Sequence, residues 1–162
     1  MSEATLLRSA ALGDAAALEK AIRTFAPSIY AYLCGMLGDE HEAEDAMQEA
    51  FVRAARAIER YATDRDPEQW IFDLARRVAV DVRPTPSAPP GEPPPAEGDI
   101  AEWARRSLRA LPAELREVVV CRNILKWDFD HMSRALGVPM DEVSNRLQSA
   151  YGRLTDGMRG IR

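Results

Sequence analysis

The sequence WDFDHMSRALGVPMDEVSNRLQSAYGRL, residues 127–154, decides the fold of the C-terminal half of this chain. Asp128 is a good N-cap for a short helix over residues 129–136, and Gly137 is the expected C-terminal stop. A longer helix is expected after Pro139. Apolar residues recur where the two helices would pack together: Met132, Leu136, Val138, Val143 and Leu147. A short helix, a tight turn and a longer helix predict a helix-turn-helix unit.

The longer helix of this unit carries polar side chains that point away from the expected packing face. Asn, Arg and Gln side chains can read base edges through paired hydrogen bonds, and Ser can bond bases or phosphates. We interpret this helix as a candidate for the DNA major groove. Its candidate contacts are Ser144, Asn145, Arg146, Gln148, Ser149 and Arg153. A helical hairpin that packs only against protein remains an open alternative.

Helical periodicity also organises the rest of the chain. Apolar residues recur at three- and four-residue spacing, while strand signals are poor and no Asn-Gly or Asp-Gly hairpin turn occurs. The spacing predicts helices over residues 5–13, 14–37, 41–61, 67–83, 100–111 and 113–124. The sequence therefore predicts an all-α protein.

A proline-rich segment divides the helical sequence into two parts. Seven of the eleven prolines fall between Pro84 and Pro95, in the acidic stretch PTPSAPPGEPPPAEGD. Such a composition cannot form a core and is expected to be extended or disordered. We therefore predict a domain over residues 1–83, a linker over residues 84–100 and a second domain over residues 101–162.

Charge is distributed unequally between these parts, and the net charge of the chain is −5. Residues 1–83 carry 10 basic and 15 acidic side chains, whereas residues 101–162 carry 11 basic and 8 acidic side chains. Only the second part has the sign that contact with phosphates favours. We expect an acidic chain of this kind to bind DNA weakly by itself and to need a partner that supplies a positive channel.

Enzymatic, metal-binding and cofactor-binding patterns are not found in the sequence. His41 lacks a second His at zinc-helix spacing, His131 has no nucleophile nearby in sequence and is expected at the surface, and no glycine-rich phosphate loop occurs. Cys34 and Cys121 form no disulfide or metal pattern, so we interpret both as buried apolar groups, with redox sensing left open. The first residues show neither a signal peptide nor a membrane segment, which predicts a cytoplasmic protein.

Three segments resemble conserved parts of the extracytoplasmic-function sigma factors of the sigma-70 family. LLRSAALGDAAALEKAIRTFAPSIYAYLCGMLGD with EAEDAMQEAFVRAARAIERY is similar to the second conserved domain, and PEQWIFDLARRVAVDVR resembles its promoter-opening segment. LPAELREVVVCRNILKWDFDHMSRALGVPMDEVSNRLQSAYGRL resembles the helix-turn-helix of the fourth domain. The resemblance implies a sigma2-like helical bundle and a sigma4-like helix-turn-helix domain, joined by the Pro-rich linker.

The resemblance also implies a docking helix for RNA polymerase. In that family, a helix with the pattern Glu-Asp-x-x-Gln-Glu-x-Phe binds the clamp helices of the largest polymerase subunit. The matching polymerase-binding residues are Glu44, Asp45, Gln48 and Glu49, and Phe51 is expected in the core. The last three of these polar residues share one helix face by their spacing. An acidic face exposed only to solvent is the alternative.

Promoter contacts follow from the same resemblance. The family opens DNA and captures a flipped base of the minus-ten element with its fourth helix and the preceding loop. The candidate minus-ten residues here are Tyr61, Arg65, Asp66, Arg76, Arg77, Asp81 and Arg83, while Trp70 is interpreted as a core residue. The minus-thirty-five element would be read by the helix-turn-helix, which has fewer basic residues than is usual in the family. Promoter affinity is therefore expected to be low.

The expected partners are core RNA polymerase, promoter DNA and an anti-sigma factor. Polymerase contact would involve the clamp helices of the largest subunit and the flap of the second-largest subunit. The predicted function is promoter recognition, DNA melting and transcription initiation. A sigma-like interaction protein that binds polymerase or an anti-sigma factor without starting transcription is one alternative. A helix-turn-helix repressor or activator that never binds polymerase is the other.

Overall fold

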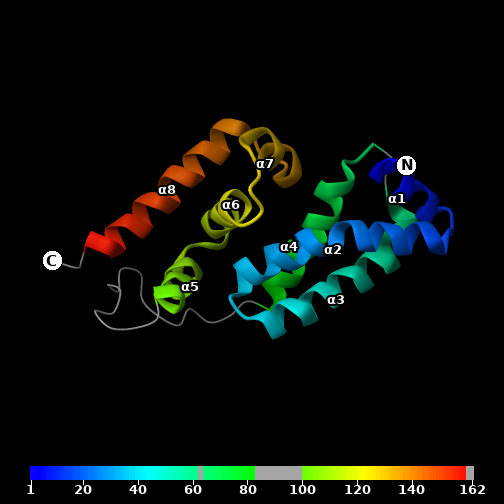
Figure 1. Cartoon of the computed structure of the whole chain (residues 1–162). Coiled ribbons are helices and arrows are strands. Elements are labelled where there is room, and N and C mark those ends of the chain that lie inside the picture. Colours follow the sequence, from blue (N-terminus) through cyan, green and yellow to red (C-terminus); the bar gives the residue numbers. More distant parts are fainter. Residues whose placement is uncertain (62–63, 83–99, 160–162) are drawn as a thin grey trace.

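The computed structural model describes residues 1–61, 64–82 and 100–159, and every regular element within these ranges is helical. The first half contains α1 (Glu3–Ala11), α2 (Ala15–Leu37), α3 (Glu40–Ala57), the 3-10 turn η1 (Ile58–Arg60) and α4 (Pro67–Val82). The second half contains α5 (Ile100–Ala110), α6 (Ala113–Asn123), α7 (Phe129–Leu136) and α8 (Met140–Arg159). Figure 1 shows the two halves side by side. The prediction of an all-α fold is confirmed, and none of these helices has the length and apolar character needed to cross a membrane.

Short polar side chains fix where several helices begin. The carboxylates of Asp14, Asp39, Asp66 and Asp128 each accept a hydrogen bond from the backbone amide three residues later, at distances of 2.8 to 3.1 Å. These bonds satisfy amides that have no partner inside the helix. Gly137 ends α7 at a φ of 67°, in the left-handed region where an L side chain is strained.

The long helix α2 is the centre of the first half and packs against α1, α3 and α4. Its buried face carries Phe25, Ile29, Tyr32 and Leu33, and Pro27 lies inside the helix without ending it. The face of α3 that is turned inward is built mainly from small residues: Ala43, Ala46, Ala50 and Ala54. Small side chains let α3 approach α2 closely, so the longer polar side chains of α3 are left on its outer face.

The second half is arranged around α6, which is buried along most of its length. Val118, Val120 and Cys121 have no exposed surface, and the helix-turn-helix formed by α7 and α8 packs on α6. The apolar residues predicted to join α7 and α8 are buried or half-buried there: Met132, Leu136, Val138, Val143 and Leu147. The predicted packing of the helix-turn-helix is confirmed.

The two halves share one continuous apolar core, which the sequence did not predict. Helix α6 packs on α2, and α7 packs on α4. The ring of Trp127 meets Phe72 of α4 edge-on, with 4.9 Å between the ring centroids. We call this contact surface, between α2 and α4 on one side and α6 and α7 on the other, the seam.

Candidate functional site

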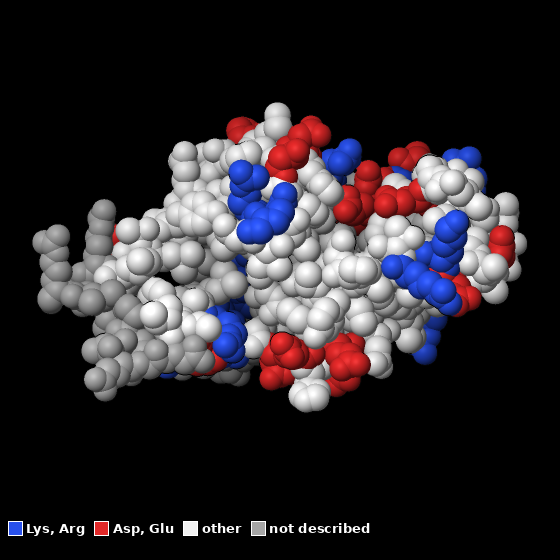
Figure 2. Space-filling model, in the orientation of Figure 1, with Lys and Arg blue, Asp and Glu red and all other residues white. Residues whose placement is uncertain are grey.

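The outer face of α3 carries the residues expected to bind polymerase. Glu44, Asp45 and Gln48 are exposed, and Glu49 is half-buried. Figure 2 shows acidic atoms gathered along the edge of the molecule where α3 begins. Helix packing brings these four side chains together on one rigid element, which offers carboxylate and amide oxygens to donors on a partner.

Glu49 differs from the other three because it already has a partner within the domain. Arg53 Nε donates to Glu49 Oε1 at 2.7 Å, and Arg53 Nη1 donates to Asp81 Oδ2 of α4 at 2.8 Å. Asp81, which was expected to accept from a DNA base, therefore takes part in a bridge between α3 and α4. Phe51 is buried, as predicted.

Tyr61 lies in the core of the first half and does not present its ring to solvent. The side chain is 6% exposed, its ring meets Trp70 edge-on at 5.3 Å, and its hydroxyl donates to the carbonyl oxygen of Arg65 at 2.7 Å. The prediction that Tyr61 stacks on a flipped base is not supported in this conformation, because the ring is used for packing. Trp70 is buried, as predicted.

A chain of ion pairs runs along α4 and across the seam. Arg65 Nη2 lies 2.6 Å from Asp73 Oδ2, and Arg76 Nη1 lies 2.7 Å from Asp73 Oδ1. Arg76 Nε lies 2.7 Å from Glu117 Oε1 of α6. Two of the predicted minus-ten residues, Arg65 and Arg76, are therefore engaged by carboxylates, and one of those carboxylates belongs to the other half of the molecule.

Glu117 is the centre of the polar part of the seam. Its side chain is buried, and the same Oε1 that accepts from Arg76 also accepts from the hydroxyl of Tyr32 at 2.7 Å. Burial by itself would lower the pKa of Arg76, but the Glu117 carboxylate outweighs that effect, so the pKa is raised. Burial, together with Glu117, raises the pKa of Tyr32 well above its ordinary value. Arg76 therefore stays charged and Tyr32 stays neutral at neutral pH.

The start of α4 makes a second set of contacts across the seam. His131 Nε2 lies 2.7 Å from Glu68 Oε2, and Arg134 Nε lies 3.9 Å from Asp66 Oδ2. The imidazole of His131 stacks on Trp127 with 4.2 Å between centroids. The expectation that His131 is a plain surface residue is wrong, because the seam half-buries it. Asp66, a predicted base contact, is the N-cap of α4.

The remaining minus-ten candidates have different surroundings. Arg77 is exposed on α4. Arg83 lies outside the described residues, as do residues 84–99 of the predicted linker, whereas Ile100 already belongs to α5.

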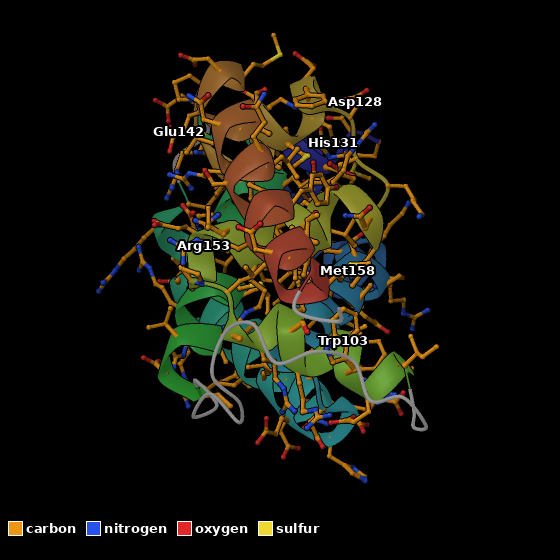
Figure 3. The ribbon with its side chains drawn as sticks, turned by 90° about the vertical axis from the view of Figure 1, so that its left-hand side faces the viewer. Trp103, Asp128, His131, Glu142, Arg153 and Met158 are labelled. Carbon is orange, nitrogen blue, oxygen red and sulfur yellow. The ribbon has the colours of Figure 1, made fainter. Side chains whose placement is uncertain are left out.

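Helix α8 presents most of its predicted DNA-contacting face to solvent. Asn145, Gln148, Ser149 and Arg153 are exposed, and Ser144 is half-buried. In Figure 3, α8 runs along the face turned toward the viewer, and Glu142 and Arg153 project from the same side of it. These side chains are accessible to a partner without any change in the seam.

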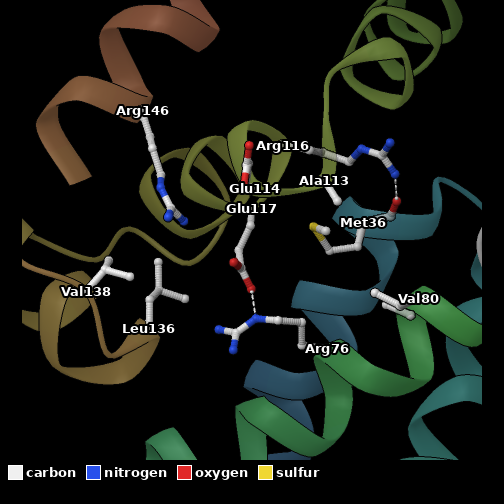
Figure 4. Close-up of a pocket in the computed structure, with 11 residues that line it drawn as sticks. Met36, Arg76, Val80, Ala113, Glu114, Arg116, Glu117, Leu136, Val138 and Arg146 are labelled. Atoms are coloured by element: carbon white, nitrogen blue, oxygen red, sulfur yellow. Dashed lines mark hydrogen bonds and ion pairs between the residues drawn. The ribbon is translucent and has the colours of Figure 1, made fainter. Parts of the chain in front are cut away.

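Arg146 departs from this pattern. Its Nε donates to Glu142 Oε1 at 2.7 Å, and its side chain lines a hollow of about 390 Å³ between the two halves. Figure 4 shows Arg146 reaching from α8 toward α6 and the residues of the seam. The prediction that Arg146 points outward is therefore wrong for this conformation.

The two cysteines are free, and only Cys121 is fully buried. Cys34 is half-buried, which corrects the expectation that both are core residues. Burial raises the pKa of the Cys121 thiol well above its ordinary value and raises that of Cys34. A higher pKa leaves less thiolate at neutral pH, which weakens the case for redox sensing.

Sequence reasoning missed the residues that build the seam, above all Tyr32, Glu68 and Glu117. One signal was present: in LREVVVCR of α6, apolar residues stand on every side of the helix, which is typical of a helix covered all round. A helix-turn-helix domain alone covers only part of such a helix. The pattern therefore indicates a further covering surface, although it does not say which one.

Comparison with known proteins gives the class of the chain. Residues 21–83 match the family described as sigma-70 region 2. SigW of Bacillus subtilis, an extracytoplasmic-function (ECF) RNA polymerase sigma factor, is 25% identical over 92% of this chain and 92% of its own length. The ECF sigma factor SigC of Mycobacterium tuberculosis is 27% identical over 92% of this chain and 87% of its own length. SigE of Mycolicibacterium smegmatis is 26% identical over 90% of this chain, which spans only 64% of that relative.

Solved structures share the fold of the whole chain. A structure of CnrH in complex with the cytosolic domain of CnrY has a TM-score of 0.74 and 21% identity, and the match covers 99% of each chain. The sigma factor RpoE in complex with the anti-sigma factor NepR, from Bartonella quintana, has a TM-score of 0.63 and 15% identity over 89% of this chain and 98% of that chain. These likenesses establish the two-part helical fold.

Residues 21–83 therefore carry a sigma-70 region 2 domain, and a helix-turn-helix follows it in the structure. Over 92% of its length the chain is similar to extracytoplasmic-function sigma factors. The resemblance stated from the sequence is confirmed.

Proposed function

We propose that this protein binds core RNA polymerase, carries it to promoters, melts the minus-ten region and starts transcription. The family supports an RNA polymerase-binding role. The observation that carries the proposal on this chain is the outer face of α3, where Glu44, Asp45 and Gln48 are exposed on one rigid helix. Charge-assisted bonds from Arg side chains to such acceptors would fix the register of a helical partner.

The subunits contacted are part of the same proposal. The α3 face would meet the clamp helices of the largest polymerase subunit, and the second domain would meet the flap of the second-largest subunit. Docking on α3 requires no rearrangement of the domain because the four side chains already share one surface. This assignment rests on family resemblance and on the exposure of α3.

Promoter contact would come from both domains. Arg77 and the residue just after α4, Arg83, would meet phosphates near the minus-ten element, and the outer face of α8 would enter the major groove of the minus-thirty-five element. Arg65, Arg76, Asp66 and Asp81 are paired within the protein and would have to exchange those partners for DNA. The shortage of cations on α8 predicts weak duplex binding in the absence of polymerase.

An anti-sigma factor completes the proposed set of partners, and the cytoplasm is the proposed site of action. The structures that share this fold include CnrH with the cytosolic domain of CnrY and RpoE with the anti-sigma factor NepR. By family resemblance, we expect this chain to bind an anti-sigma factor as well.

Reconstituted transcription with purified core polymerase tests the proposal. We expect the full chain to co-elute with core enzyme and to produce a specific start site on a promoter library. Changing Asp45, Gln48 and Glu49 together to Ala should abolish both results. Glu19→Ala, which removes an exposed acid from α2, is the matched control and should leave both unchanged.

The same assay separates the alternatives. A sigma-like interaction protein would bind core enzyme or an anti-sigma factor and give no start site. A repressor or activator would bind duplex DNA and not co-elute with polymerase. Co-elution that survives the triple change would show that α3 is not the docking surface.

A further inference from the structure

The hollow of about 390 Å³ in the seam is lined by residues of five helices: α2, α4, α6, α7 and α8. Its apolar walls come from both halves of the molecule, with Met36 and Val80 from the first half and Leu136 and Val138 from the second. Small-molecule sites in proteins occupy about 300–1,000 Å³ and combine an apolar lining with a few polar groups. The hollow therefore has the size and the lining to hold the body of a small ligand.

Hydrogen bonds beside the hollow hold its walls in place. Glu117 is 5% exposed and accepts bonds from Tyr32 and Arg76, both of the first half, at 2.7 Å each. Arg116 Nη1 of α6 donates to the carbonyl oxygen of Met36 of α2 at 2.7 Å. Because these bonds fix α6 against α2 and α4, the hollow is formed before any ligand arrives. A preformed site costs a ligand little reorganisation on binding.

Arg146 of α8 supplies a polar group that faces into the hollow. Its side chain is 22% exposed, and its Nε donates to Glu142 Oε1 at 2.7 Å. Within the described residues this is the one hydrogen bond of the guanidinium, so both terminal nitrogens keep their donors. Figure 4 shows the side chain of Arg146 directed into the hollow, toward Leu136 and Glu117. Two such nitrogens can bind a carboxylate through a pair of parallel bonds.

The charges around the hollow favour an anion that carries a single charge. Three arginines line it, Arg76, Arg116 and Arg146, together with two carboxylates, Glu114 and Glu117. Two of these arginines also pair with carboxylates outside the lining, so their positive charge is largely offset. A doubly charged anion such as a phosphate monoester would be repelled by the carboxylates. A cation could meet only Glu114, whose charge is screened because the residue is exposed, since Glu117 is already paired.

We propose that the hollow is a binding site for a small amphipathic carboxylate, with its head group on Arg146 and its apolar body between the walls from the two halves. Val80 is 58% exposed, so the apolar wall reaches solvent and gives such a ligand a way in. Because both halves build the site, a bound ligand would stabilise their contact by mass action. The inference is independent of the proposed promoter function.

Methionine methyl signals in the NMR spectrum of the full chain test the position of the site. The probe is octanoate, which joins one carboxylate to a short alkyl chain. Met36 lines the hollow, whereas Met140 and Met158 are exposed on α8. We expect the Met36 signal, identified by its loss in Met36→Leu, to shift and saturate at millimolar octanoate while the signals of Met140 and Met158 stay in place. Octanol and octylamine, which keep the chain and lack the carboxylate, should bind about tenfold more weakly or worse, because bonds to charged groups are the strong ones.

A substitution at Arg146 tests the head-group contact. Arg146→Met removes the guanidinium and keeps an unbranched side chain, so it should bind octanoate about tenfold more weakly than wild type and octanol equally well. Arg153→Met, at an exposed position of the same helix, is the matched control and should bind octanoate as wild type does. The comparison of octanoate with octanol on the wild-type chain decides the question by itself if Arg146→Met fails to fold.

Several results would overturn the inference. A Met36 signal that does not shift, or that shifts without saturating, would show that the hollow binds no small amphiphile. Equal shifts at Met140 and Met158 would show general adsorption to apolar surface. Octanol or octylamine binding as tightly as octanoate, or unchanged octanoate affinity in Arg146→Met, would show that the guanidinium does not hold a carboxylate. None of these results depends on transcription, so a wild-type chain that gives no start site would overturn the proposed function alone.

Discussion

Helices α3 and α4 pack side by side in the same domain, but their outer faces have different neighbours. The polar face of α3 is exposed and offers Glu44, Asp45 and Gln48 to a partner. One face of α4 instead lies under α7, and its Arg76 is already paired with Glu117 of α6. The polar face of α3 is thus accessible to a partner without rearrangement, whereas the face of α4 is covered by the rest of the chain.

The difference has a physical origin in the two helix sequences. The inward face of α3 is made mainly of alanines, with Phe51 as its one large buried side chain, so the long polar side chains of α3 are directed outward. Helix α4 instead carries bulky apolar residues over a wide arc, including Trp70, Phe72 and Val78, and one domain alone covers only part of that arc. The uncovered part becomes a docking surface for the second half of the chain.

The largest expected effect comes from Phe72→Ala, which removes the residue shared by the domain core and the seam. Phe72 has no exposed surface and meets both Tyr32 and Trp127 edge-on. Truncating a buried Phe costs about 3–5 kcal/mol, so we expect a loss of that size in the free energy of unfolding, measured by urea denaturation. A loss below about 1 kcal/mol, the centre of measured single-mutant effects, would contradict the packing described for α4.

A smaller loss is expected for Tyr32→Phe, which affects the seam alone. The change deletes the hydroxyl that donates to Glu117 and leaves the buried carboxylate with one partner fewer. We expect a loss of about 1–3 kcal/mol in urea denaturation. Tyr30→Phe, two residues earlier and half-buried on α2, is the control and should change stability by less than about 0.5 kcal/mol. Equal losses in the free energy of unfolding for the two variants would mean that the Tyr32 hydroxyl does not stabilise the buried carboxylate of Glu117.

Glu3→Gln should give a small gain that depends on pH. Partial burial, followed by repulsion from Glu68 and Asp66, raises the pKa of Glu3 above its ordinary 4.5, and these effects outweigh attraction to His131 and Arg134. A carboxyl with a raised pKa in the folded state destabilises the fold once pH exceeds that pKa. The variant should therefore be more stable than wild type at pH 7, and the difference should shrink as pH falls toward 4.5 and below. Thermal unfolding at several pH values measures this, and a constant difference would contradict it.

The smallest change in stability is expected on the open face of α3. Gln48 is exposed there, so Gln48→Ala should alter the free energy of unfolding by no more than about 0.5 kcal/mol. The same variant should weaken co-elution with core polymerase. A variant that loses stability and polymerase binding together would show that the face supports the fold and would remove the contrast between α3 and α4.

Local features of the fold could be predicted from the sequence. Asp128 was predicted from capping chemistry to begin a helix, and Gly137 was predicted to end it; each does so in the structure. The apolar spacing in α7 and α8 predicted which side chains pack together. These features are local, because each depends on residues within one or two turns of helix.

The seam could not be predicted because it depends on residues distant in the sequence. Tyr32 and Glu117 are separated by 85 residues, and nothing in either segment specifies the other as a partner. Dependence on distant residues also explains why Tyr61 and Arg146 were predicted to contact DNA. Tertiary packing places Tyr61 in the core and Arg146 beside the hollow between the halves. The apolar character of α6 on all sides was the one local sign of the missing partner.

Trp127 gives the closed arrangement a built-in optical reporter. Its indole is stacked on His131 and covered by Phe72, so it is shielded from water only while the two halves are together. Trp70 and Trp103 are the other tryptophans of the chain, and replacing both with Phe would leave Trp127 as the single emitter. In such a protein, any separation of the two halves would appear as a shift of emission to longer wavelength, without any attached label.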